Sequence, residues 1–194
     1  MIDQPQSMFF SYSLLKRLNL IICKLNYFAS LDVDKVVMMI VSRFFIARTA
    51  IAEVMQDLVA AGKTRYWGLS NHSAAETGAF LKEARIAGVE DYYNIAGSHC
   101  EEDGRPRASI YEEEMIPLLK RENLGCLAFS PMDTGLLAPA VPEDPALAAL
   151  AASIDQVADD LGTVRASVCV AWVLHQGLTC VLAGAESPEH VDAN

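Results

Sequence analysis

Two short polar side chains, Ser70 and Asn71, directly follow the apolar run at residues 66–69. A serine hydroxyl and an asparagine amide both donate and accept hydrogen bonds, so together they can hold an amide or hydroxyl group of a small molecule. In parallel α/β folds, ligands bind where the carboxyl ends of strands meet polar loops of this kind. This segment therefore predicts a small-molecule site at a strand end.

The elements that must position this pair alternate along the chain. Apolar runs of strand length indicate strands near residues 36–41, 66–69, 92–96, 124–129 and 179–182. Apolar residues at helical spacing fall between these runs. Alternating strands and helices predict an α/β fold with parallel strands and right-handed crossovers.

Several helix ends have specific sequence signals. Ser73 and Glu76 have the spacing of a capping box, and Asp144 with Pro145 fits the cap and first position of a helix. Further expected helix starts and stops are caps at Ser109, Thr163 and Ser187, stops at Gly62, Gly88 and Gly162, and a kink at Pro117.

Length and charge limit the class of protein. A chain of 194 residues with 52% hydrophobic content can form one globular domain. The net charge is −10, and residues 51–194 carry nine Lys and Arg against twenty-two Asp and Glu. Such a surface repels phosphate backbones at long range, so nucleic acid is not an expected partner.

The five cysteines show neither paired nor metal-ligand spacing. We expect them to be free thiols that pack as small apolar side chains, in a protein of the reducing cytoplasm. No metal-ligand cluster is visible in the sequence.

The N-terminal segment, residues 1–32, differs in character from the rest. Its apolar residues follow helical spacing, and Lys16, Arg17 and Lys24 fall within the apolar stretch, unlike the charges of a signal peptide. A packed helix and a membrane-surface helix are the two interpretations; no run is long enough to span a bilayer. We therefore divide the chain into a divergent helical segment, 1–32, and a domain at 33–194.

A family resemblance rests on four segments that occur in order along roughly residues 50–194. They read DLVAAGKTRYWGLSN at 57–71, LGCLAFSPM at 124–132, AWVL at 171–174 and AGAESPEH at 183–190. Together they resemble the aldo-keto reductases. The resemblance implies a (β/α)₈ barrel of the TIM type, of which this chain holds about five βα units, with NADP(H) lying across the carboxyl ends of its strands.

The resemblance also implies a set of cofactor contacts. Ser70 and Asn71 would hold the nicotinamide carboxamide, and Phe129 would stack under the nicotinamide ring. The remaining implied contacts are Ser130, Met132, Gly135 and Leu136 at the pyrophosphate, and Gly184, Ala185, His190 and Asn194 around the adenosine.

Some positions depart from the family pattern. Glu186 and His190 stand where the family usually has a cation for the 2′-phosphate, which leaves NAD(H) as the alternative cofactor. Ile95 stands where the family has a glutamine that contacts the nicotinamide. The family's Asp, Tyr, Lys and His tetrad is not found, and Ser42 occupies the place of its His, so the catalytic residues are unknown. His72 is interpreted as a solvated loop residue.

Three functional interpretations follow. The first is an NAD(P)(H)-dependent oxidoreductase acting on a carbonyl or alcohol substrate, truncated or catalytically impaired. The second is a non-catalytic relative that binds nucleotide or another protein, and the third is a gene fragment without activity of its own. Five strands cannot close a barrel, so the chain is expected to be incomplete, rebuilt at its start, or associated with a second copy through the open barrel edges.

Overall fold

A computed structural model describes residues 38–42, 48–98, 110–138, 140–185 and 187–193. The segment 1–32 and the expected cap at Ser109 lie outside these residues. The described residues fall in two compact units, with residues 38–39 and 48–67 in one, and residues 40–42 and 68–193 in the other. The described residues at which ligand contacts are expected all belong to the second unit.

Helix α2, Arg48–Ala60, lies in the first unit. Along the chain it stands between strands β1, Met38–Ser42, and β2, Tyr66–Ser70, each of which is divided between the two units. Ala52 and Met55 are the buried residues of α2. The helix stops as predicted at Gly62, which has φ +68°, and the Lys63 amide donates to the carbonyl of Leu58 at 2.9 Å. Glycine suits this position because a side chain there would be strained.

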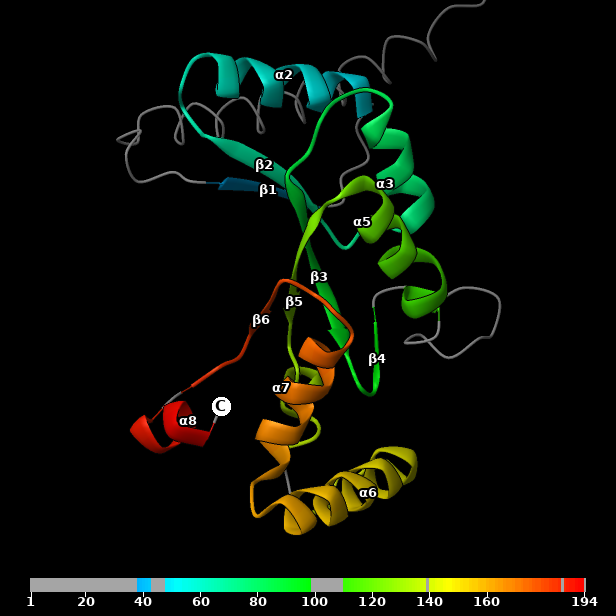
Figure 1. Cartoon of the computed structure of the whole chain (residues 1–194), viewed down its shortest axis with the longest axis vertical. Helices are drawn as coiled ribbons and strands as arrows, with labels where there is room; N and C mark the ends of the chain where they lie inside the picture. The colour runs from blue at the N-terminus through cyan, green and yellow to red at the C-terminus, as the bar shows by residue number, and fades with distance from the viewer. Residues whose placement is uncertain (1–37, 43–47, 99–109, 139, 186, 194) are drawn as a thin grey trace, which may run out of the picture. The chain divides into compact units, whose positions relative to one another are not determined.

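The strands follow the order β1, β2, β3, β5, β6, and the second unit holds residues 40–42 of β1, residues 68–70 of β2 and the strands that follow. Strands β3 (Gly88–Asn94), β5 (Gly125–Phe129) and β6 (Cys180–Leu182) run parallel to β2 and to one another. The intervening helices are α3 (Ala74–Leu81), the π-helix η2 (Tyr111–Met115) with α5 (Ile116–Glu122), and α6 (Pro145–Leu161) with α7 (Arg165–His175); α8 (Pro188–Ala193) follows β6. Figure 1 shows this alternation along the chain.

Strand β3 begins four residues earlier than the sequence predicted. Gly88, expected to end a helix, is the first residue of β3 and pairs with Gly125 of β5, while α3 already ends at Leu81. A Cβ atom on Gly88 would lie 2.3 Å from the carbonyl oxygen of Gly125. The glycine is required here by close strand packing and not by a helix terminus.

One face of the sheet packs against helices and forms the core. Val89, Asp91 and Tyr93 alternate on the buried face of β3, as Cys126 and Ala128 do on β5. The Tyr93 ring stacks on Tyr111 of η2 at 4.5 Å and lies 5.5 Å from the ring of Trp172 of α7. Helices η2 and α7 therefore cover this face.

The helix ends agree with the sequence in most places. Ser73 and Glu76 form the predicted capping box, and the Asp144 carboxylate accepts from the amides of Ala146 and Leu147 at the start of α6. Gly162 ends α6 in the left-handed region, as predicted. Helix α7, in contrast, is capped at Val164 without a side-chain hydrogen bond, so the expected Thr163 cap is wrong.

The distortion predicted at Pro117 lies where the π-helix η2 passes into α5. Pro117 lies in the first turn of α5, directly after η2, and the Ile116 amide donates to the carbonyl of Tyr111 five residues earlier. Proline has no amide hydrogen, so the wide π-turn passes into an α-helix at the point where a donor is missing.

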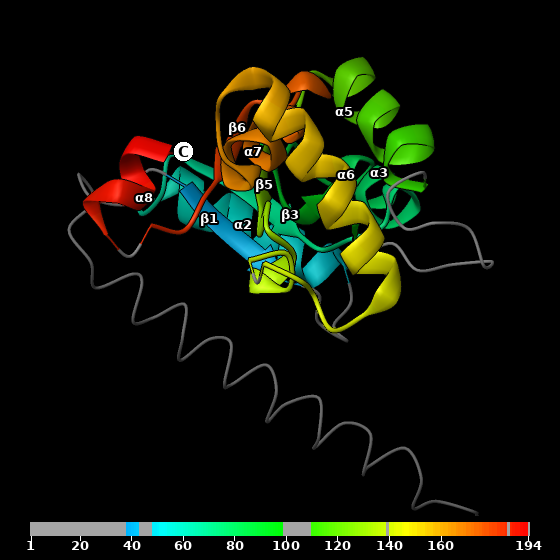
Figure 2. The same ribbon diagram turned by 90° about the horizontal axis from the view of Figure 1, so that it is seen from below.

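Two further features complete the unit. The short strand β4, Gly97–Ser98, pairs antiparallel with the end of β3. Cys126 and Cys169 are buried as expected, but Cys180 is exposed on β6 at the end of the strand order, which corrects its assignment to the core. Helices α6 and α7 lie side by side in Figures 1 and 2.

In the part of the chain that the structure describes, each helix is too short or too polar to cross a bilayer.

Candidate functional site

The carboxyl end of β2 holds the serine and asparagine pair in a fixed turn. Asn71 has φ +56°, in the left-handed region that asparagine tolerates better than most residues. Its backbone amide donates to Asp91 Oδ1 at 2.8 Å, and its side-chain Oδ1 accepts from the Tyr92 amide at 2.9 Å. Ser70 is 7% exposed and lies beside Glu90 in the parallel register. The pair therefore occupies the strand end where the sequence placed it.

The end of β5 is tied to the end of β3 through Asn94. The Asn94 Nδ2 atom donates to the carbonyl of Ser130 at 3.0 Å, while its Oδ1 accepts from the amides of Ala96 and Gly97. Ser130 itself has φ +59°. Because Asn94 is fully buried, these bonds fix the two strand ends relative to each other.

The face of the sheet opposite the core carries Glu90, Tyr92 and Phe129, all half-buried. Tyr92 is the register partner of Phe129, and the two rings meet edge to face at 5.7 Å. Parallel strands lie about 4.8 Å apart, so Ser70 and Phe129 stand roughly two strand spacings apart across the sheet. Phe129 thus presents an aromatic ring on the same face as Ser70.

Glu90 and Tyr92 were not identified from the sequence. The family resemblance placed Ile95 where relatives have a glutamine that contacts the nicotinamide. In the structure, Ile95 follows β3 and packs against a cluster of Leu137, Ala151, Ile154 and Cys169. The polar residue beside Ser70 on this face is Glu90. The alternation of Val89, Glu90, Asp91 and Tyr92 is the signal that would have found it.

The loop after β5 turns sharply. Asp133, Thr134 and Gly135 all have positive φ, and the Gly135 and Leu137 amides both donate to the carbonyl of Met132. Met132 packs against the Leu137 cluster, whereas Gly135 and Leu136 are exposed. This segment holds the four residues expected at a pyrophosphate, and two of them face solvent.

Asp133 places a carboxyl group in this same loop. The residue is 8% exposed, and burial raises the pKa of its carboxyl group above the ordinary value. An ionised carboxylate here disfavours a second anion nearby, so it works against a bound phosphate.

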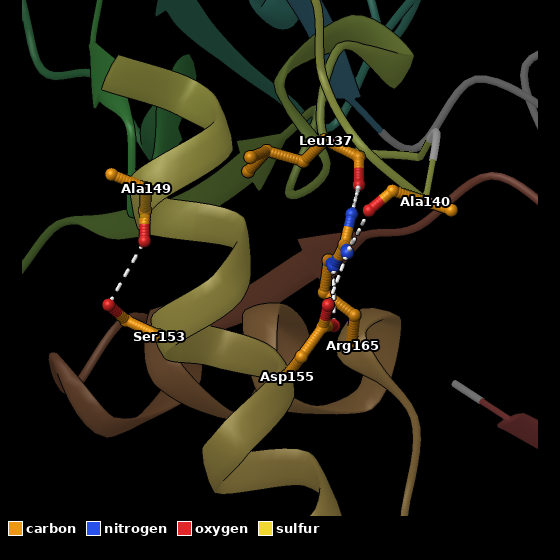
Figure 3. Close-up of polar contacts among 6 residues, drawn as sticks. All are labelled: Leu137, Ala140, Ala149, Ser153, Asp155 and Arg165. Carbon is orange, nitrogen blue, oxygen red and sulfur yellow. Dashed lines mark hydrogen bonds and ion pairs between the residues drawn. The ribbon is translucent and has the colours of Figure 1, made fainter. Parts of the chain in front are cut away.

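Arg165 anchors the far end of the loop to the helices, as Figure 3 shows. Its Nε and Nη2 atoms donate to the two carboxylate oxygens of Asp155 at 2.7 and 2.5 Å. Its Nη1 donates to the carbonyl of Leu137 at 2.7 Å, and Nη2 also reaches the carbonyl of Ala140 at 3.1 Å. The Arg165 guanidinium lowers the pKa of the Asp155 carboxyl group. A bidentate fork of this kind is specific to arginine.

We expect Arg165→Ala to lower the melting temperature by roughly 2–4 °C, because the loop carbonyls lose charged donors. The measurement is thermal unfolding followed by circular dichroism. Since the Asp155 pKa is lowered in the folded protein, the contribution of this pair is present at neutral pH and is lost as the pH falls through that pKa. The deficit of the variant should therefore shrink in acid.

Arg121→Ala is the matched control for this change. Arg121 pairs with its neighbour Glu122 at 3.0 Å, and its side chain is 65% exposed. Exposed ion pairs contribute little to stability, so this variant should have the same melting temperature as the unmodified protein. Equal melting temperatures for the two variants would contradict the assigned role of Arg165.

The expected adenosine contacts lie beyond β6. Gly184 and Ala185 follow the strand end and are exposed, and the space around Gly184 is open. His190 is exposed on α8, where its amide donates to the Ser187 hydroxyl at 3.3 Å. Asn194 lies outside the described residues. The structure thus brings the ends of β2, β3, β5 and β6 to one edge of the sheet, with α8 following.

The tyrosines of the core are unsuited to proton transfer at neutral pH. Burial raises the pKa of both Tyr93 and Tyr111 far above the ordinary value. Tyr66 is exposed at the start of β2, at the other end of that strand from Ser70. Among the described residues, Tyr92 is the tyrosine on the face that carries Phe129.

His72 is buried, with 5% exposure, and meets the Phe80 ring edge on at 5.4 Å. The interpretation as a solvated loop residue is therefore wrong, because the side chain packs under α3. Among the described residues, no group of three or more His, Cys, Asp or Glu is placed to hold a metal ion.

Comparison with known proteins identifies the family of the chain. The fold is α/β and matches solved aldo-keto reductases over 81% of the chain, as a partial barrel. Residues 13–194 match the model of the aldo/keto reductase family. The chain belongs to this family, which confirms both the resemblance and the fold class.

Individual relatives show how much of a family member the chain represents. A Saccharomyces cerevisiae protein named as an aryl-alcohol dehydrogenase is 28% identical over 152 residues, which are 66% of this chain and 41% of that protein. An aldo-keto reductase of Klebsiella pneumoniae in complex with NADPH is 24% identical with a TM-score of 0.60, and the glycerol dehydrogenase of Gluconobacter oxydans is 21% identical with a TM-score of 0.64. Each of these two structural matches covers 81% of this chain and 51% of the solved protein. It thus spans about half the length of these relatives.

Proposed function

We propose that the chain binds a nicotinamide dinucleotide at the carboxyl ends of β2, β5 and β6, as part of an oxidoreductase acting on a small carbonyl or alcohol. The observation that carries this proposal is the joined set of strand ends, in which Asn71 and Ser130 are fixed through buried Asp91 and Asn94. Family membership supports the cofactor class, because the Klebsiella relative was solved with NADPH. Cytoplasmic location is part of the proposal.

The side chains fit the nicotinamide end of such a ligand better than the phosphate end. Asn71 Oδ1 is already occupied by the Tyr92 amide, which leaves Nδ2 as the donor of that side chain. Phe129 offers a flat ring on the same face. Asp133 disfavours a phosphate at its loop. We therefore infer weak binding dominated by the nicotinamide.

The choice between NADP(H) and NAD(H) depends on the segment after β6. Residues 184–194 contain Glu186, Glu189 and Asp192 but no Lys or Arg. An acidic segment repels a 2′-phosphate and can accept a hydrogen bond from a free ribose hydroxyl. The Klebsiella relatives were solved with NADPH or NADP, which supports NADP(H), whereas this charge supports NAD(H) as the alternative.

A role in binding without turnover is the second candidate. The proton donor of a carbonyl reduction is not assigned, because Tyr93 and Tyr111 are fully buried and their hydroxyls donate to Glu112 and Asp91. Binding nucleotide would then serve regulation or contact with a partner. A second copy of the chain is one such partner, since β6 ends the strand order and exposes Cys180 and Leu182.

Titration with NADPH and with NADH, followed through cofactor fluorescence, tests the proposal. We expect saturable but weak binding, with the mass of the protein determined by light scattering at the same concentration. A reactive aldehyde is then added and the absorbance of the reduced nicotinamide is followed. Oxidation supports the oxidoreductase, and binding without oxidation supports the second candidate. Failure to bind either nucleotide would refute both.

A further inference from the structure

We propose that Tyr111 and Asp91 are positioning residues that hold Asn71 for its ligand. The inference rests on the proposed function, because it deepens the role of Asn71 in that site. It concerns a buried chain of hydrogen bonds that leads from the π-helix η2 through β3 to the end of β2. Neither Tyr111 nor Asp91 faces the ligand edge of the sheet.

The first link fixes the asparagine itself. Asp91 Oδ1 accepts from the Asn71 backbone amide at 2.8 Å, and Asn71 Oδ1 accepts from the Tyr92 amide at 2.9 Å. The Tyr92 amide requires an acceptor, so the side-chain oxygen of Asn71 must face it and Nδ2 must point elsewhere. Asn71 therefore presents a donor, and the ligand group that it recognises is a carbonyl oxygen.

The second link fixes the aspartate. Asp91 is completely buried, and a buried carboxylate requires hydrogen-bond donors. The Tyr111 hydroxyl donates to its Oδ2 at 2.8 Å and lies 3.4 Å from the Cys126 sulfur. Burial raises the Tyr111 pKa, so the phenol keeps its proton to donate. One carboxylate thus joins the π-helix to the turn at Asn71.

The third link explains the π-helix. The wide turn begins at Tyr111, whose carbonyl accepts from the Ile116 amide five residues later. Turns of this kind are rare and recur at functional sites. Here the turn places the buried Tyr111 against the sheet. A regular α-helix has fewer residues per turn, so it would direct the same side chains differently.

Tyr93 provides a matched control. Its ring stacks on Tyr111 at 4.5 Å, its side chain is equally buried, and its hydroxyl donates to Glu112 at 2.9 Å. A Tyr93→Phe variant therefore removes one buried phenol hydroxyl from the same ring pair without removing a donor to Asp91. Tyr111→Phe removes the donor to Asp91.

The experiment compares hydrogen exchange and binding in these two variants. Hydrogen exchange of the Asn71 amide is measured by NMR, with the Ala128 amide as the internal reference. Relative to that reference, the Asn71 amide should exchange at least about tenfold faster in Tyr111→Phe than in the unmodified protein. In Tyr93→Phe it should exchange at the unmodified rate. Binding of NADPH should weaken roughly five- to tenfold in Tyr111→Phe alone, the loss of about one hydrogen bond.

Each outcome bears on one claim. An Asn71 amide that stays protected in Tyr111→Phe overturns the positioning role whatever the binding data show. NADPH binding that is equal in both variants overturns this inference and leaves the proposed function standing. Failure of the unmodified protein to bind both NADPH and NADH overturns the proposed function and the ligand role together. If Tyr111→Phe does not fold, Asp91→Asn, which keeps the shape but changes the acceptors, is tested against the same expectations.

Discussion

Phe129→Ala should remove measurable binding of NADPH and NADH. The ring is half-buried on the open face of the sheet, beside Tyr92 and at the carboxyl end of β5. Stacking of a flat base on an aromatic ring contributes about 2 kcal/mol, which corresponds to roughly thirtyfold in the dissociation constant. Added to binding that is already weak, this loss places the dissociation constant beyond the range of a fluorescence titration.

Two comparisons make this result specific. Phe129→Tyr keeps the flat ring and should bind at least as well as the unmodified protein. Val157→Ala removes an exposed apolar side chain from α6, distant in sequence from the strand ends, and should leave binding unchanged. An unaltered dissociation constant in Phe129→Ala, in a protein that still unfolds cooperatively, would show that the ring does not stack on the ligand.

Gly88→Ala should destabilise the protein by about 3 kcal/mol, the upper range for overpacking. The new Cβ atom would lie 2.3 Å from the carbonyl oxygen and 2.9 Å from the carbonyl carbon of Gly125, so β3 and β5 must separate where they pair. The clashing atoms belong to the backbone of a central strand, so they cannot move aside as the end of a flexible side chain can. Urea unfolding, followed by circular dichroism, measures the change in the free energy of unfolding.

Gly125→Ala tests the same strand pair from the other side. A Cβ atom on Gly125 meets its nearest neighbours, the Ala87 carbonyl oxygen and Thr179 Oγ1, at 3.7 Å, an ordinary contact distance. We therefore expect a change within about 1 kcal/mol. Equal stabilities for the two alanine variants would show that the close approach at Gly88 does not restrict this strand.

The sequence predicted the elements whose signals are local. The capping box of Ser73 and Glu76, the Asp144 cap and the stop at Gly162 depend on side chains within a few residues of the helix end. The same reasoning failed at Gly88, because a glycine that ends a helix and a glycine that admits a neighbouring strand are identical in sequence. The predicted strand, 92–96, therefore left out Glu90, the residue that lies beside Ser70.

The strand-end pair of Ser70 and Asn71 could be predicted as a candidate site, but its supports could not. Asp91 and Tyr111 are twenty residues apart, and their hydrogen bond depends on how η2 packs on β3. Aspartate inside an apolar strand pattern was the available signal, since a buried carboxylate must find donors. Nothing local to Arg165 indicated that it would hold the loop at Leu137.

The central claim is that the ends of β2, β5 and β6 form one binding site for a dinucleotide. NMR titration of the labelled protein with NADPH tests it most directly, through the backbone amides of Asn71, Ser130 and Gly184. The account predicts that all three amides shift with a single dissociation constant. Shifts confined to one of the three, or three different dissociation constants, would contradict it.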